Sequence, residues 1–175
     1  MKKGLKRIVL YVLLVLAVAI TLKAINYLPE LIQRDTLREY EDVEGIRREL
    51  GIKVYVPAYL PAGIKWPPST IMAQKRPFKA IFMLYRDSVS GGNMLSVHQS
   101  ETRDFIRYRA FGFKEVTQRA EHDLVGRKAL LEVGKCSDGD QCSRISWEED
   151  GAFIKIEMRS GPFDAIRLAE SIRPR

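Results

Sequence analysis

The feature that most constrains this chain is an uninterrupted apolar run near its start. Residues 8–22 read IVLYVLLVLAVAITL, without a charge, and KAINYL continues the apolar character to Leu28. As a helix, residues 8–28 measure about 31 Å, close to the thickness of the hydrocarbon core of a bilayer. Lys23 can extend its ammonium group to the headgroups, and Tyr27 lies where interfacial aromatic residues gather. The sequence therefore predicts a transmembrane helix over residues 8–28.

Two other interpretations of this run stay open. A cleaved signal peptide would use Ala17-Val18-Ala19, whose small residues fit a signal peptidase site. The apolar character continues past this motif through Ile20 and Leu22, which favours a retained anchor. The third interpretation is a buried helix of a soluble domain.

The basic residues around the run predict its orientation. Lys2, Lys3, Lys6 and Arg7 precede it, whereas acids and arginines are mixed in the stretch that follows. The positive-inside rule then places residues 1–7 in the cytoplasm and the bulk of the chain outside, in the periplasm or the extracellular space. These four residues and Lys23 carry most of the net charge of +7, which leaves about +2 for the rest of the chain. So small a remainder does not favour nucleic acid as a partner.

The part beyond the run divides into a stalk and a domain. We expect residues 29–41, which are strongly charged, to form a helical stalk. The extracytoplasmic domain then covers residues 42–175. It opens with a short helix that Asp42 caps and Gly51 ends.

Strand patterns fill most of this domain. Asp150-Gly151 predicts a tight hairpin turn. Pro162 opens a closing helix with an apolar stripe. Segments with alternating or β-branched apolar residues predict strands at IKVYV, STIMAQK, KAIFMLYRD, NMLSVHQSE, LVGRKALLEV, SRISWEED and AFIKIEMRS. The fold class is therefore α+β: a mainly antiparallel sheet of about six or seven strands, with a short helix before it and a C-terminal helix packed on it.

The chain has two cysteines, Cys136 and Cys142, on either side of the turn-forming residues SDGDQ. Outside the cytoplasm, two cysteines in one small domain usually pair, so we expect a disulfide across a hairpin loop. A redox pair and a zinc site with His98 and His122 are alternatives, but neither has its typical spacing. We therefore expect no metal site and no cofactor.

The segment with the most functional promise is TRDFIRYRAFGFKEVTQR, residues 102–119, where basic and aromatic residues interleave. One interpretation is an amphipathic element with its aromatic rings in the core. The other is a surface that contacts anionic lipid headgroups or an acidic partner. Its candidate residues are Arg103, Arg107, Tyr108, Arg109, Phe111, Phe113 and Lys114.

No motif of a catalytic site is present: there is no Gly-x-Ser-x-Gly, no His-Glu-x-x-His and no P-loop. His98 falls in a predicted strand and His122 in a predicted polar turn. We therefore expect a protein that is not an enzyme.

The order of these pieces resembles a bacterial extracytoplasmic domain of unknown function. The resemblance lies in a short helix and strand followed by Pro-x-Tyr-Leu-Pro-x-Gly (Pro57 to Gly63), in LVGRKALL, in the tryptophan hairpin RISWEEDGAFIKIE and in the closing helix FDAIRLAESI. That family occurs on single-pass membrane proteins, including some anti-sigma factors, and on lipoproteins. The insert CSDGDQC and the basic-aromatic segment depart from its pattern.

These observations predict a membrane-anchored binding module of the cell envelope, an accessory or sensor subunit whose partner is another envelope protein or an anionic lipid surface. The alternative is an envelope carrier that binds an apolar ligand in a cavity of the sheet. A carrier needs a sizeable apolar cavity, whereas a binding module needs a packed core and an exposed patch.

Overall fold

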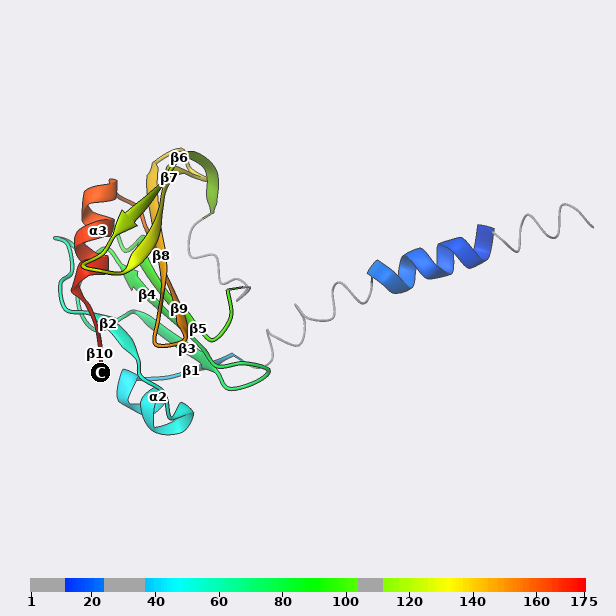
Figure 1. The fold of residues 1–175 in the computed structure, drawn as a ribbon, viewed down its shortest axis with the longest axis horizontal. Helices are drawn as coiled ribbons and strands as arrows, with labels where there is room; N and C mark the ends of the chain where they lie inside the picture. Colours follow the sequence, from blue (N-terminus) through cyan, green and yellow to red (C-terminus); the bar gives the residue numbers. More distant parts are fainter. Residues whose placement is uncertain (1–11, 24–36, 104–111) are drawn as a thin grey trace, which may run out of the picture. The chain divides into compact units, whose positions relative to one another are not determined.

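The computed structural model of the chain describes residues 12–23, 37–103 and 112–175 (Figure 1). The chain divides into two compact units, Met1–Leu37 and Arg38–Arg175. The described part of the first unit is a helix over residues 12–23, and the large apolar side chains along it are between 51% and 66% exposed. Among the described residues, no helix combines the length and the apolar character needed to cross a membrane. The ends of the predicted span, residues 8–11 and 24–28, lie outside the described residues.

The second unit contains two helices and ten strands among its described residues. In chain order they are β1 (Arg38–Glu39), α2 (Val43–Leu50), β2 (Tyr55–Pro57), β3 (Thr70–Gln74), β4 (Ala80–Arg86), β5 (Asn93–Ser100), β6 (Phe113–Asp123), β7 (Lys128–Cys136), β8 (Gln141–Glu149), β9 (Ala152–Met158), α3 (Pro162–Ser171) and β10 (Ile172–Pro174).

Eight of the strands form one antiparallel sheet in the order β1-β3-β4-β5-β9-β8-β7-β6, and β10 pairs with β2 in a separate two-stranded sheet. The predicted α+β class and its mainly antiparallel sheet are confirmed. The large sheet has eight strands, where about six or seven were predicted. β6 escaped prediction because nearly all of its side chains are exposed, so no apolar alternation marks it. The predicted strand at IKVYV is also displaced, because β2 begins at Tyr55 and pairs with β10.

The expected helical stalk does not reach the start of this unit. Arg38 and Glu39 form β1, which pairs with Ala73 and Met72 of β3, and the Tyr40 amide donates to the Ile71 carbonyl. The preceding residues up to 36 lie outside the described part of the chain. Arg38 and Glu39 form a strand because the edge of β3 offers hydrogen-bond partners to their backbone groups. In a solvated helix these groups would not need β3 as a partner.

Helix α2 forms as its sequence predicts. The Asp42 carboxylate accepts a hydrogen bond of 2.6 Å from the Gly45 amide at the N-terminus, and Gly51 ends the helix with φ of 62°. Val43, Ile46 and Leu50 are buried, so one face of α2 joins the core.

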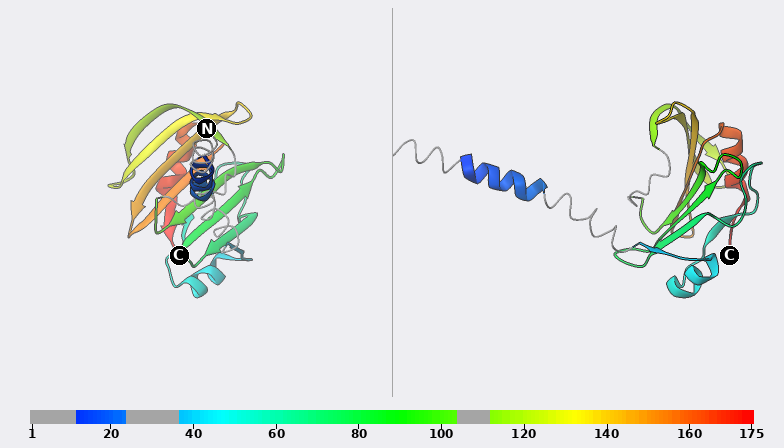
Figure 2. Two further views of the ribbon diagram at one scale, coloured as in Figure 1. Left: turned by 90° about the vertical axis from the view of Figure 1, so that its right-hand side faces the viewer. Right: turned by 180° about the vertical axis from the view of Figure 1, so that it is seen from behind.

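One face of the large sheet carries the apolar core, and α3 packs against it over β8 and β9 (Figure 2). Of the stripe predicted on the closing helix, Ala165, Leu168 and Ala169 are fully buried on α3, whereas Ile172, also buried, is the first residue of β10. Burial of a side chain such as that of Leu168 contributes about 1.5–3 kcal/mol to stability, and this contact helps to hold the helix on the sheet.

Two hairpin turns set the ends of β7, β8 and β9. Asp150 and Gly151 have φ of 51° and 75°, which confirms the predicted turn between β8 and β9. The other turn corrects a prediction: Val125 and Gly126 also have positive φ, so LVGR closes the β6–β7 hairpin and β7 begins only at Lys128.

Gly134 of β7 lies where β6 comes closest. A Cβ at this position would overlap the Glu115 carbonyl and would lie 3.0 Å from a ring atom of Phe113. We predict that Gly134→Ala lowers the free energy of unfolding by about 1–3 kcal/mol, as overpacking does, in urea denaturation of the full chain. Gly92→Ala is the control, because its Cβ meets only Ser90 Oγ at 3.4 Å. Equal stability of the two variants would contradict this close packing.

Candidate functional site: the polar face of the sheet

The face of the sheet opposite the apolar core is polar over β5, β9, β8 and β7, whereas over β4 it carries the buried Phe82 and Leu84, which lie opposite His98 and Ser96. Along β8, Ile145 and Trp147 join the core, and Arg144 and Ser146 alternate with them on the other side. The strand register aligns further polar residues beside these two. We call this surface the polar face; its members are Ser96, His98, Arg119, Glu132, Arg144, Ser146, Lys155 and Glu157.

A row of alternating charges crosses four strands of the polar face. Arg144 Nε donates to Glu157 Oε1 at 2.9 Å, and its Nη1 donates to Glu132 Oε2 at 3.2 Å. Arg119 Nη2 donates to Glu132 Oε1 at 2.6 Å. The side chains of Glu132 and Glu157 are only 8% and 5% exposed, and that of Arg144 is 26% exposed. Two buried carboxylates are stable here because one guanidinium bonds to both.

Lys155 lies beside this row, with Nζ 3.6 Å from Glu157 Oε1. Burial lowers the pKa of Lys155, and the Glu157 carboxylate opposes that shift. Together with Arg119 and Arg144, Lys155 balances the two acids, so the charges of this face are largely satisfied by one another.

His98 is a buried titratable group on β5, the strand at one side of the polar face. Burial lowers its pKa well below the usual value, and the charges of Lys155 and Arg144 add to that shift, so His98 is neutral at pH 7. Ser96 Oγ lies 3.1 Å from His98 Nε2, and Glu157 Oε2 lies 3.9 Å from the same nitrogen. A nucleophilic Ser–His–acid arrangement needs the acid at the opposite ring nitrogen. This geometry therefore does not serve that chemistry.

The structure keeps the residues of the alternative zinc site apart. His98 is in β5 and His122 is in β6, and three strands separate β5 from β6 in the sheet. The prediction that His122 lies in a turn is thus wrong. Within residues 12–23, 37–103 and 112–175, no group of three or more His, Cys, Asp or Glu side chains could hold a metal ion.

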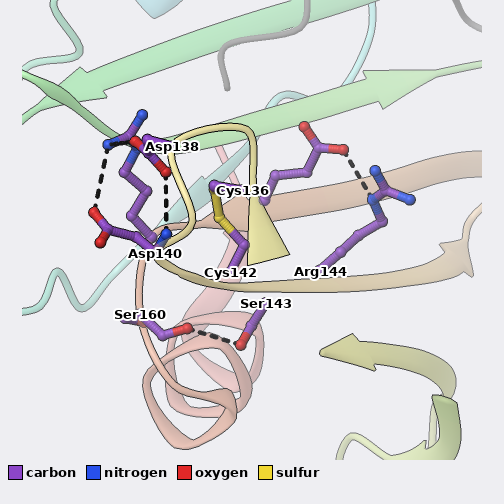
Figure 3. The surroundings of a disulfide bond; sticks show 9 residues. Cys136, Asp138, Asp140, Cys142, Ser143, Arg144 and Ser160 are labelled. Atoms are coloured by element: carbon purple, nitrogen blue, oxygen red, sulfur yellow. Dashed lines mark hydrogen bonds and ion pairs between the residues drawn. A yellow bond between two sulfur atoms is a disulfide. The ribbon is translucent and has the colours of Figure 1, made fainter. Parts of the chain in front are cut away.

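Cys136 and Cys142 meet as a disulfide across the β7–β8 loop, with their Cα atoms 5.5 Å apart (Figure 3). The Cys136 amide donates to the Asp140 carbonyl, and Gly139 has φ of 95°, so turn chemistry brings the cysteines together. Both are buried, and Phe113 of β6 packs against them. The disulfide thus also holds the start of β6.

Ionic contacts tie the disulfide loop to the end of β9. Arg159 Nη1 forms an ion pair with Asp138 and lies 3.9 Å from Asp140 Oδ2. Ser143 Oγ donates to the Ser160 carbonyl at 2.8 Å (Figure 3). The two aspartates of the loop therefore face a cation that the protein itself supplies, the Arg159 guanidinium.

The predicted interaction surface is divided between two places. Arg103 pairs with Glu148 at 3.1 Å and lies 6.0 Å from the ring centroid of Phe153. Phe113 lies under the Arg144 guanidinium at 4.4 Å, towards the opposite end of β8. Lys114 is exposed at the start of β6. The other predicted members, Arg107, Tyr108, Arg109 and Phe111, lie outside the described residues.

Of the residues predicted to flank the membrane, Lys23 is described, and it is exposed on the helix over residues 12–23. The others lie outside the described residues: Lys2, Lys3, Lys6, Arg7 and Tyr27.

The sequence did not predict a cleft that the structure shows near Tyr55. Lys53 Nζ bonds to Asp150 Oδ2 at 2.7 Å, and the Tyr55 hydroxyl donates to the same oxygen at 3.2 Å. Burial and this carboxylate raise the pKa of Tyr55 to about 12. The cleft has a volume of about 300 Å³ and also includes Lys79 and Glu101. Lys53 and Asp150 are 97 positions apart, so no local pattern could connect them.

Comparison with known proteins identifies no relative: no family model, curated protein or solved structure matches the chain. The resemblance to an extracytoplasmic domain therefore stays a prediction.

The buried His98 predicts a pH dependence of stability. The pKa of His98 is depressed in the folded chain. Below a pH of about 6.5 the unfolded chain therefore binds a proton at His98 that the folded chain does not bind. Between pH 7 and 5 we expect wild type to lose stability more steeply than His98→Gln, by up to about 1.4 kcal/mol per pH unit. Urea denaturation at each pH measures this slope. His122→Gln should keep the wild-type slope, and a steep slope in His98→Gln would refute the assignment.

Proposed function

We propose that the protein is a membrane-anchored binding module of the cell envelope. Residues 8–28 cross the cell membrane once with the N-terminus in the cytoplasm, and the unit Arg38–Arg175 lies on the outer side. There it binds another envelope protein or an anionic lipid surface and acts as an accessory or sensor subunit that catalyses no reaction.

The observation that carries the proposal is the helix over residues 12–23. Its large apolar side chains lie at positions that cover every side of a helix, and each is more than half exposed. A helix that is apolar all round needs an apolar surrounding, and the hydrocarbon core of a membrane supplies one. The four basic residues before it support an orientation with the N-terminus inside.

The disulfide supports the outer location. Disulfides persist in oxidising compartments and are rare in the cytosol. Cys136 and Cys142 are both buried, and Phe113 covers them, so this pair fits a structural role in such a compartment.

The charged groups of the polar face favour a binding role over catalysis, because they already bond to one another. Glu132 and Glu157 bond to Arg144, and His98 is buried and neutral, so these groups are engaged in holding the sheet. Lys114, exposed at the start of β6, is suited to an anionic partner.

The carrier alternative has less support in the described part of the chain. The apolar face is packed, with Ile145, Ile154 and Ile156 fully buried. The cleft near Tyr55 is open and has charged residues in its lining, whereas an apolar ligand favours an enclosed apolar cavity.

A topology assay tests the proposal. In cells that produce the full chain, a reporter that works only outside the cytosol should be active when it is fused after Arg175. A reporter that works only inside the cytosol should be inactive at the same position. Alkaline extraction should leave the fusion in the membrane. Exchanging Lys2, Lys3, Lys6 and Arg7 for glutamate should reduce the outside signal severalfold, because the orienting charge is lost. The matched control exchanges Lys65, Lys75, Arg76 and Lys79 of the second unit.

Three results would overturn the proposal: reporter activity inside the cytosol, release of the fusion by alkaline extraction, or a mature chain that begins after Ala19.

In the same cells, a photo-crosslinker at Lys114 should capture lipid or an envelope protein, whereas one at Arg48 of α2 should not. Equal labelling from both positions would contradict the binding role.

A further inference from the structure

Strand β6 has no partner on its outer edge in the large sheet among the strands that the structure describes. It is the last of the described strands in the sheet order, it spans 11 residues, and it lies beside β7 at the rim (Figure 1). The opposite edge strand, β1, has only two residues. An open edge presents unpaired backbone donors and acceptors to any further strand. Bulges interrupt β6 only up to Gln118, so Gln118–Asp123 is regular and suited to pairing.

The charge row of the polar face ends at this edge. Across β9, β8, β7 and β6 the row reads Glu157, Arg144, Glu132, Arg119, with signs that alternate from strand to strand. Arg119 is the terminal cation, and its side chain is 63% exposed although it bonds to Glu132. A further strand would continue the alternation if it placed a carboxylate opposite Arg119.

We propose that this further strand is β6 of a second copy of the chain, antiparallel to the first and centred on Ala120. In that register Arg119 lies opposite Glu121 of the second copy, and Glu121 lies opposite Arg119 of the second copy. Opposite residues of an antiparallel pair share a face, so both new ion pairs extend the charge rows of the two polar faces. Gln118 then faces His122 of the second copy.

The sequence of β6 selects this register over its neighbours. A pairing centred on Arg119 places two arginines opposite each other, and one centred on Glu121 places two glutamates opposite each other, and both arrangements are unfavourable. Centring on Ala120 brings its two small side chains together at the two-fold axis. The result is an isologous dimer with one sheet continuous through both copies. The inference does not depend on the membrane anchor.

Cysteine crosslinking of the full chain in the cells that produce it tests the register. Opposite Cα atoms lie about 4.5–5.5 Å apart in an antiparallel pair, within disulfide range. Ala120→Cys should therefore give a covalent dimer on mild oxidation. Gln118→Cys is the matched control: the two copies of residue 118 would lie roughly 13 Å apart and should not link. Gln118→Cys chains mixed with His122→Cys chains should link.

A charge variant tests the same dimer without a new cysteine. Glu121→Arg replaces two Arg–Glu pairs with two Arg–Arg contacts, so the dissociation constant measured by sedimentation of the detergent-solubilised full chain should rise at least about tenfold. Glu115→Arg, in the bulged half of β6, makes the same change in charge and should leave the constant within about twofold. A monomeric wild type, a link through Ala120→Cys to a different protein, or equal linking of Ala120→Cys and Gln118→Cys would overturn the proposal.

Discussion

Arg144 holds two buried carboxylates on one side of a sheet whose other side is apolar. Its guanidinium bonds to Glu157 on β9 and to Glu132 on β7, so one side chain joins three strands. This contact restricts the register of β7, β8 and β9. A slip of one residue in β8 would turn Arg144 into the core and leave both carboxylates without their shared cation, while Ile145 and Trp147 would leave the core. The apolar face and the polar face therefore require the same strand alignment.

The disulfide and the charge row act together on β6, the strand with least support from the core. Most side chains of β6 are exposed, so burial contributes little to holding it. Instead, Phe113 packs on Cys136 and Cys142 at one end, and Arg119 bonds to Glu132 further along. This arrangement keeps β6 ordered although none of the described strands pairs with its far edge. The chain can thus present a strand for pairing without exposing a large apolar surface.

Local signals predicted much of this fold. The Asp42 cap, the Gly51 stop, the Asp150-Gly151 turn and the stripe of α3 each depend on neighbouring residues, and each is found where expected. β6 was not predicted as a strand because a strand held by polar contacts has no apolar period. The cleft near Tyr55 and the bonds of Arg144 join residues far apart in the sequence, and only the strand register brings them together. His98 was placed in a strand correctly, but its burial among charges depends on β9 and β8.

The central claim is that Arg144 and Glu157 stabilise the sheet as a coupled pair. A double-mutant cycle with Arg144→Met and Glu157→Gln, measured by urea denaturation at pH 7, tests it directly. We predict a coupling free energy of about 2 kcal/mol, because both side chains lose solvent on folding. The same cycle on the exposed pair Arg47–Glu44 of α2 should give less than about 0.5 kcal/mol. Additive effects of the Arg144 and Glu157 substitutions, with a coupling no larger than that of the exposed pair, would contradict the account.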